Sequence, residues 1–344
     1  MLGLSLRRSL WMIPSFFAVS GGAGTSIQLP PGDFVTIRAL EYESQGTADG
    51  ARAVRELHET FHLDESMTMR YLRWVGLHWF TTFDSQDTGL LQGNLGRSME
   101  FDRSVNSVAG DRIALTVVIS LATILLTWAI AIPIGIYSAV RQYSIGDYTL
   151  TLLGFLGMSV PGFLLALVLM FFAHRYFGVS VTGLFSPEFA TTPGWSLPKL
   201  QDFLRPLWLP PVVLGLGGTA GKIRVMRANL LDELRKPYVT TARAKGLTEL
   251  NLLLKYPVRL ALNPFISGIG SLFPALISGG AIVAIVLSPP MVGPLMLTAL
   301  MSEDVYLAGS MLMVMTLLGI LGTLVSDLLL LWLDPRIRFE GGGR

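Results

Sequence analysis

The sequence contains no cysteine and few ionisable side chains. The absence of cysteine among its 344 residues excludes disulfide frameworks, thiolate metal sites and cysteine nucleophiles. Charged residues make up 15% of the chain, against roughly 25% in soluble domains. A net charge of +2 provides no electrostatic footprint for nucleic acid. The 51% hydrophobic content and the mean hydropathy of +0.55 instead indicate a membrane protein.

Motifs for catalysis or nucleotide binding are also lacking. His58 and His62 are spaced to share a helix face, but no third metal ligand accompanies the HETFH run, and we interpret it as a solvated helix. The run 217–222 resembles a phosphate-binding loop, but Ile223 stands where that loop has its magnesium-binding hydroxyl. The sequence therefore predicts no enzyme activity, cofactor or metal site in this chain.

Several apolar runs reach the ~20 residues that a helix needs to cross a membrane. Two weaker runs accompany them, and prolines within such runs are tolerated where neighbouring helices satisfy the backbone. We expect the first run to be an uncleaved span because no clean A-x-A cleavage site follows it. The sequence thus predicts an all-α, polytopic bundle of six transmembrane helices. The four clear spans are 113–137, 150–173, 260–287 and 306–333, and the two weaker ones are 9–29 and 207–221.

Arginine and lysine cluster in four regions that fall on one side of a six-span topology, and basic loops face the cytoplasm. Both termini are therefore predicted to be cytoplasmic. This topology predicts how the chain is divided. Residues 1–29 form the cytoplasmic N-terminus and the first helix, and residues 30–112 form a small helical, extracytoplasmic insertion. Residues 113–333 form the transmembrane core, with a cytoplasmic coupling loop at 222–262, and 334–344 form the tail.

The segment 234–247 within that loop has the clearest local pattern. Pro237 suits the first turn of a helix, and Gly246 is placed to end it in a left-handed cap. A second helix is predicted over 247–262, interrupted by Pro257. A short capped helix held between two spans suits docking to a partner protein. The alternative is an amphipathic helix on the inner lipid surface.

The run TTARAKG at 240–246 resembles the EAA-type loop of ABC importer permeases, and its surroundings are similar to the oligopeptide/dipeptide permease family. Further matches are PPGD at 30–33, GNLGRS at 93–98, IPIGI at 132–136 and LDPRIR at 333–338. The resemblance implies a type I importer in the bacterial inner membrane. Its two permease subunits would work with two ATP-binding subunits, which hold ATP and magnesium, and with an extracytoplasmic substrate-binding protein.

The family resemblance also implies roles for particular residues. The EAA-type helix would sit in a groove of the ATPase, with Ala242 permitting close packing there. The coupling residues would be Tyr238, Thr240, Thr241, Ala242, Lys245 and Gly246. The resemblance also implies Gly279, Gly280 and Ala284 as cavity or subunit contacts. Asp327 is a further candidate for such a contact on a separate ground, because a charge inside a membrane span is costly.

Two departures from the family pattern affect the expected substrate and function. Thr240 replaces the usual glutamate of the loop, and Ala284 stands where a glutamate is common. The absence of this glutamate from the predicted cavity leaves two classes of substrate open, a peptide and an oligosaccharide, because the family includes importers of both. An ion-driven secondary transporter would have internal repeats and acidic residues near the membrane midplane. We find no repeat, and Asp327 is the only acidic residue within a clear span. The alternative to a cavity or subunit contact is that Asp327 pairs with a basic residue just beyond the end of that span. A membrane anchor without transport is the remaining alternative.

Overall fold

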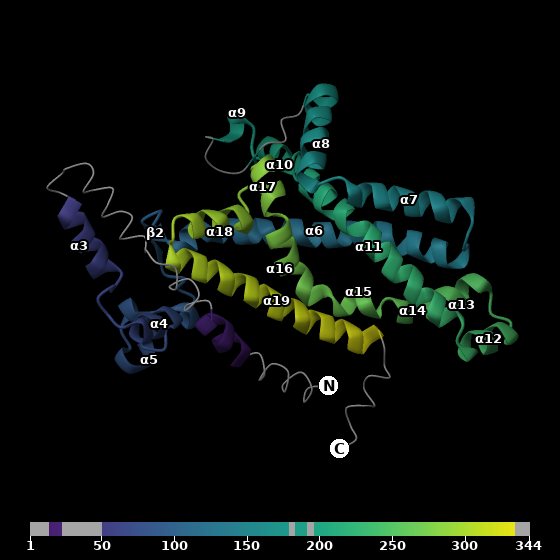
Figure 1. The fold of residues 1–344 in the computed structure, drawn as a ribbon, viewed down its shortest axis with the longest axis horizontal. Coiled ribbons are helices and arrows are strands. Elements are labelled where there is room, and N and C mark those ends of the chain that lie inside the picture. Colours follow the sequence, from purple (N-terminus) through teal and green to yellow (C-terminus); the bar gives the residue numbers. More distant parts are fainter. Residues whose placement is uncertain (1–13, 23–49, 179–182, 191–195, 334–344) are drawn as a thin grey trace, which may run out of the picture. The chain divides into compact units, whose positions relative to one another are not determined.

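The computed structural model describes residues 14–22, 50–178, 183–190 and 196–333, and these are mostly helical (Figure 1). Within them, α6 (Val105–Val140) and α19 (Val305–Leu333) are each long and apolar enough to cross a membrane. The number rises to five if each of three bent helix pairs counts as one span. A multi-pass helical protein is therefore confirmed. Of the first predicted span only 14–22, a helix, is described, so the count of six stays a prediction.

The predicted span 150–173 is broken in the structure. It is divided into α7 (Ile145–Ser159) and α8 (Gly162–Phe177), which meet at 98°. Pro161 cannot donate a backbone hydrogen bond, and it drives the preceding Val160 into an extended conformation with φ −88° and ψ 125°. The break therefore follows from proline chemistry that an apolar-length criterion ignores.

The predicted span 260–287 is also interrupted. The helices up to Ser267 meet α16 (Ile269–Gly279) at 50°, and α17 (Ala281–Leu287) turns by 102° into α18 (Val292–Met301). Gly268 and Gly280 separate successive helices, and Ser288 takes a left-handed φ of 60°. Such breaks are tolerated at membrane depth where surrounding protein satisfies the backbone.

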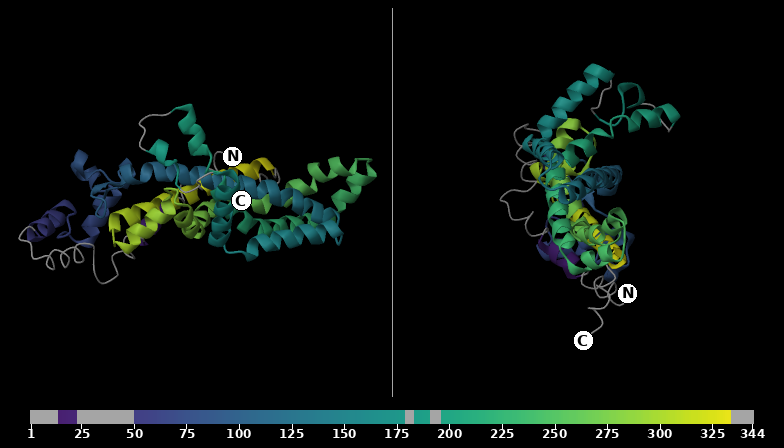
Figure 2. Two further views of the ribbon diagram at one scale, coloured as in Figure 1. Left: turned by 90° about the horizontal axis from the view of Figure 1, so that it is seen from above. Right: turned by 90° about the vertical axis from the view of Figure 1, so that its right-hand side faces the viewer.

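Helix α11 extends well beyond the predicted span 207–221. It runs over Leu209–Leu234, so the first third of the predicted coupling loop continues this helix. Pro210 and Pro211 lie in its first turn, where no backbone donor is needed. It packs against α7, α8, α14 (Pro257–Ala261) and α17, which places it at the centre of its unit (Figures 1 and 2).

The chain forms two compact units. Among the described residues, the first contains those within 115–290 and 318–333, and the second contains those within 14–114 and 291–317. In the first unit, small residues let helices approach closely, as is common in membranes. A Cβ on Gly135 of α6 would meet the Met226 side chain of α11, and one on Gly322 of α19 would lie 3.0 Å from the Cα of Gly270.

The second unit combines short helices with a two-stranded ribbon of β1 (Arg97–Ser98) and β2 (Arg103–Ser104). This ribbon departs from the all-α expectation. Asp304, which is 0% exposed, accepts hydrogen bonds from Ser98 Oγ at 2.5 Å and from the Leu307 amide at 3.0 Å, and so ties the start of α19 to the ribbon. The short helices are α3 (Gly50–Thr60), α4 (Met67–Val75), α5 (Trp79–Thr82), η1 (Ser85–Asp87) and η2 (Leu90–Gln92).

The remaining helices lie in the first unit. They are α9 (Pro187–Ala190), α10 (Leu197–Leu204), α12 (Pro237–Ala244), α13 (Glu249–Lys255) and α15 (Asn263–Ser267). Figure 2 shows α12 and α13, drawn in green, at one end of that unit. This end carries the segment with the family resemblance. The predicted tail at 334–344 lies outside the described residues.

Candidate functional site

Helix α12 begins where the sequence predicts. Lys236 is extended, with φ −75° and ψ 147°, and Pro237 occupies the first turn. Because the first turn of a helix has no partner for its amides, the missing donor of proline costs nothing there. The extended residue turns the chain sharply after α11, so α12 is a separate short helix and not a continuation.

The end of α12 is a Schellman cap at Gly246. Its φ is +79°, its amide donates to the Arg243 carbonyl at 3.0 Å, and the Leu247 amide donates to the Ala242 carbonyl at 3.4 Å. No atom lies within 4 Å of an ideal Cβ at this position. Backbone conformation, and not crowding, is therefore what requires glycine here, and the predicted left-handed cap is confirmed.

One face of α12 packs against α13 of the same chain. Val239 is 1% exposed, Ala242 is 9% exposed and Leu252 of α13 is 0% exposed, and together they form a small core. Ala242 was expected to permit close packing in a partner's groove. In the structure that small side chain lets α12 approach α13, and its packing in a partner's groove stays a prediction. The helix pair is therefore a packed unit before any partner arrives.

Two carboxylates, neither of which the sequence analysis identified, hold α12 on both sides. Glu233 at the end of α11 accepts hydrogen bonds from the Tyr238 hydroxyl and from Lys236 Nζ, each at 2.6 Å. Glu249 of α13 accepts two from the Arg243 guanidinium, at 2.5 and 3.1 Å. This contact raises the pKa of Arg243, because the hydrogen bond and the opposite charge favour its charged form. In the sequence, the only sign of these contacts is that Glu233 lies near Lys236 and that Glu249 lies near Arg243.

The outer side of α12 leaves polar side chains available. Thr240, Thr241, Lys245 and Gly246 are exposed and Tyr238 is half-buried. A cavity of about 460 Å³ beside the helix collects Tyr238, Thr241, Ala242 and Lys245. It is also lined by the cations Lys255 and Arg259. A groove with three positive side chains suits an acidic group on a partner surface.

The cavity also connects α12 to the end of α19. Leu333 lies in its wall, and Arg259 of α14 donates to the Trp332 carbonyl at 2.8 Å, with its guanidinium over the Trp332 ring at 5.8 Å from the centroid. Arg259 thus links the helices that follow α12 to the last described turn of the chain. The sequence analysis did not single out this arginine.

The other predicted site residues lie on different helices. Gly279 ends α16 and is exposed, Gly280 is buried beside Leu214 of α11, and Ala284 is buried on α17. Asp327 is half-buried on α19 and interacts with another group. Gly280 serves helix packing, since its Cβ would meet Leu214 at 3.2 Å. A cavity or subunit-contact role for these residues stays a prediction.

The glycine-rich run at 217–222 and the histidine pair His58 and His62 have ordinary structural surroundings. Residues 217–222 lie inside the continuous helix α11, not in a loop, and Lys222 Nζ lies 5.5 Å from the centroid of the Phe265 ring. His58 Nδ1 lies 3.0 Å from Asp64 Oδ1. Among the residues with described positions, no group of three or more His, Cys, Asp or Glu side chains could hold a metal.

Residues 131–339, which include all of α12, match the family described as binding-protein-dependent transport system inner membrane component. The chain belongs to this family. This permease is 29% identical to the oligopeptide transport system permease protein AppB of Bacillus subtilis, over 97% of the chain and 98% of the relative. It is 31% identical to a putative peptide permease protein of Brucella ovis, over 98% and 99%. It is 28% identical to the dipeptide transport system permease protein DppB of Escherichia coli, over 99% and 100%.

These matches extend nearly end to end and confirm the resemblance drawn from the motifs. The protein is a membrane permease subunit of an ABC importer, multi-pass in the inner membrane. Its relatives are permease components, so ATP hydrolysis belongs to partner subunits and not to this chain. The question that remains is how the geometry of α12 relates to the partner subunits that hydrolyse ATP.

Proposed function

We propose that this permease forms half of the pathway of a peptide importer and that α12 receives the motion of a partner ATPase. The observation that carries the proposal is the clamped geometry of α12, which is capped at Gly246 and tied to α11 through Tyr238 and Glu233. A second homologous permease subunit supplies the other half, and two ATP-binding subunits and an extracytoplasmic binding protein complete the assembly.

The mechanism follows from the rigidity of these links. A displacement of α12 is carried to α11 by the Tyr238–Glu233 hydrogen bond and to α13 by the buried packing of Val239 against Leu252. From α14, the contact of Arg259 with Trp332 reaches α19. Closure of the ATPases therefore biases the helices between outward-open and inward-open arrangements. The bias equals the difference in free energy with which the ATPases bind the two arrangements.

The proposed orientation places α12 in the cytoplasm with both chain termini, and the insertion at 30–112 outside. The support is the excess of arginine and lysine in the region between α11 and α16, because basic loops are retained in the cytoplasm. The alternative of α12 lying on lipid is less compatible with its inward face, since its apolar residues Val239 and Ala242 are already buried against α13.

The names of the three relatives, which refer to oligopeptide, peptide and dipeptide transport, favour a peptide substrate over an oligosaccharide. Ala284 is buried on α17 with 4% exposure. A glutamate there would need a buried partner. Alanine at position 284 fits the buried packing of α17 and is compatible with either substrate class.

A cysteine crosslink tests the contact with the ATPase. Because the chain has no cysteine, Thr240→Cys introduces a single exposed thiol on the outer side of α12. We expect an amine-and-thiol crosslinker to join it to the ATPase in assembled membranes. The matched control, Ser85→Cys, is exposed on η1 of the second unit and should give no such product. Absence of the Thr240→Cys product in an active complex would show that α12 does not contact the ATPase.

A further inference from the structure

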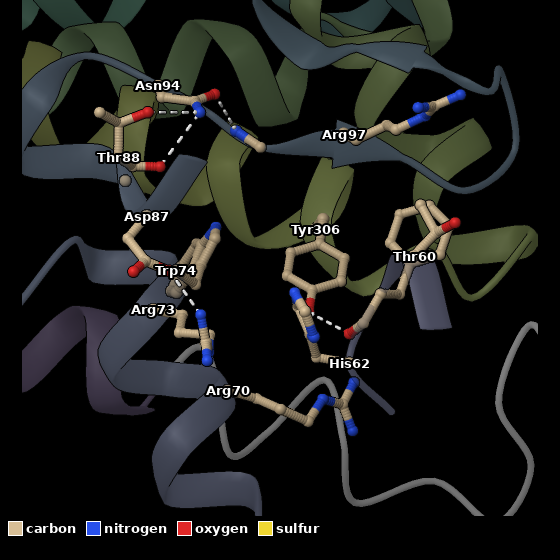
Figure 3. Close-up of a pocket in the computed structure, with 13 residues that line it drawn as sticks. Thr60, His62, Arg70, Arg73, Trp74, Asp87, Thr88, Asn94, Arg97 and Tyr306 are labelled. Atoms are coloured by element: carbon tan, nitrogen blue, oxygen red, sulfur yellow. Dashed lines mark hydrogen bonds and ion pairs between the residues drawn. The ribbon is translucent and has the colours of Figure 1, made fainter. Parts of the chain in front are cut away.

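A small cavity lies in the second unit (Figure 3). It has a volume of about 180 Å³ and is walled by α4, the segment 87–97 and the first turn of α19. Three arginines, Arg70, Arg73 and Arg97, line it against one carboxylate, Asp87. The lining itself therefore has more arginines than carboxylates, and the pairing of each arginine decides whether any charge is left for a ligand.

Most polar groups of this wall already have partners. Trp74 Nε1 donates to Ser310 Oγ at 3.3 Å, and the Tyr306 hydroxyl donates to the Phe61 carbonyl at 3.1 Å. The amide of Asn94 donates to the Thr88 carbonyl at 3.1 Å. The Phe61 and Tyr306 rings are also stacked, with centroids 5.7 Å apart. These contacts fix the wall and leave its aromatic donors unavailable to a ligand.

The three arginines differ in whether their charge is compensated. Arg73 pairs with Glu65 at 3.0 Å and with Asp87, and Arg97 pairs with Asp102 at 2.6 Å. Arg70 Nε is buried and has no hydrogen-bond partner among the described residues. Figure 3 shows Arg70 on the His62 side of the cavity, whereas Arg73 turns toward Asp87. The Arg70 side chain as a whole is half-buried. A buried donor atom without a partner is unfavourable, so the Arg70 Nε favours a ligand that brings an acceptor there.

We infer that this cavity is a carboxylate-binding site with the Arg70 guanidinium as its anchor. A guanidinium matches the two oxygens of a carboxylate with two parallel hydrogen bonds. At ~30 Å³ for each water in the liquid, the cavity has room for about six waters. It therefore accepts one acidic side chain or one terminal residue, with the Tyr306 and Trp74 rings beside its apolar part. It does not accept a whole peptide.

The source of the carboxylate rests on the proposed function, under which the second unit faces the exported side. There the group is either the terminal carboxylate of a short peptide or the acidic side chain of a docked protein. Two probes separate these sources. Trialanine offers a terminal carboxylate, and N-acetylglutamate amide offers only a side-chain carboxylate. Trialanine amide and N-acetylglutamine amide are the matched probes that lack the carboxylate.

Calorimetric titration of the full complex in lipid nanodiscs tests the site. Wild type should bind at least one carboxylate probe, and neither of the probes that lack the group. Arg70→Gln should weaken that binding about tenfold or more, as expected for the loss of a charge-assisted pair. The control Arg52→Gln removes an exposed arginine that pairs with Glu56, at 3.5 Å, and does not line the cavity, so it should not change the affinity. Binding of trialanine alone assigns the site to a peptide terminus, and binding of N-acetylglutamate amide assigns it to a protein side chain.

Undiminished binding by Arg70→Gln, or no binding of either carboxylate probe to wild type, overturns the inference. If Arg70→Gln does not assemble, arginine modification of the wild-type complex by phenylglyoxal decides. The carboxylate probe should slow modification of Arg70 but not of Arg52, and equal rates with and without it refute the site. Neither measurement depends on α12, so a failed Thr240→Cys crosslink and a failed carboxylate site are separate results.

Discussion

The Tyr238 hydroxyl donates a hydrogen bond of 2.6 Å to Glu233 across the turn between α11 and α12. Glu233 is the penultimate residue of α11, so this contact joins α12 to α11, the central helix of the first unit. Lys236 donates to the other oxygen of the same carboxylate. The base of α12 is therefore fixed by a three-residue polar cluster as well as by packing.

Removing this hydroxyl tests the mechanical link. Tyr238→Phe keeps the ring but deletes a hydrogen bond to a charged group, worth about 1.5–3 kcal/mol. We expect normal complex assembly but weaker coupling, measured as transport for each ATP hydrolysed in proteoliposomes. Tyr176→Phe, at a ring 73% exposed on α8, is the control and should leave the ratio unchanged. A wild-type ratio in Tyr238→Phe would show that the link carries no motion.

The cap at Gly246 should be sensitive to any side chain that disfavours a left-handed conformation. Gly246→Val places a β-branched residue at φ +79°, at a cost of about 1–2 kcal/mol or more. We expect faster hydrogen exchange of the α12 amides and reduced ATPase stimulation. Gly246→Asn, which tolerates this conformation better, should lie between wild type and valine. Equal exchange in all three proteins would mean that the cap does not stabilise α12.

The close crossing of α16 and α19 depends on Gly270. A Cβ there would lie 3.0 Å from the Thr323 Cα and 2.9 Å from its amide nitrogen, so backbone must shift. Gly270→Ala should lower stability by about 1–3 kcal/mol, measured as thermal unfolding of the purified complex. Gly218→Ala on α11 has open space around the new Cβ and should be neutral or stabilising by about 0.5–1 kcal/mol. Equal effects of the two variants would contradict tight packing.

Asp304 should be the most sensitive carboxylate of the second unit. It is buried and accepts hydrogen bonds from Ser98 Oγ and from the amides of Glu100 and Leu307. Asp304→Ala leaves buried donors unpaired, at about 1–3 kcal/mol each, and limited proteolysis near the ribbon should accelerate. Asp102→Asn removes the charge of an exposed pair with Arg97, worth about 0–1 kcal/mol. Asparagine tolerates the positive φ of 48° at this position, so this control should behave like wild type. Similar proteolysis rates would contradict the proposed role of Asp304.

The sequence predicted α12 more accurately than the long spans. Pro237 and Gly246 act through backbone conformation within a few residues, so their effect does not depend on distant contacts. The spans 150–173 and 260–287 were predicted from the length of each apolar run. That length does not change when the helix is broken inside the run. Pro161 and Gly268 were present in the sequence, but helices at membrane depth also tolerate proline and glycine without such breaks.

The residues that hold the candidate sites were harder to predict than the helices. Glu233 and Tyr238 are five positions apart and meet only because Lys236 turns the chain. Arg70 has the same side chain as Arg73, and the difference between them is that Glu65 and Asp87 compensate only Arg73. Charge compensation is a property of three-dimensional neighbours, so composition and spacing do not reveal it.

The sequence by itself determined the class of the protein, because hydrophobic content, local capping residues and a short motif are all properties of neighbouring positions. It also determined where α12 begins and ends. Only the tertiary structure decided that Ala242 packs inside the chain and that residues 291–317 join the second unit. It also decided that Arg70 Nε has no hydrogen-bond partner among the described residues. Burial and pairing depend on which distant segments meet, and no local pattern specifies that.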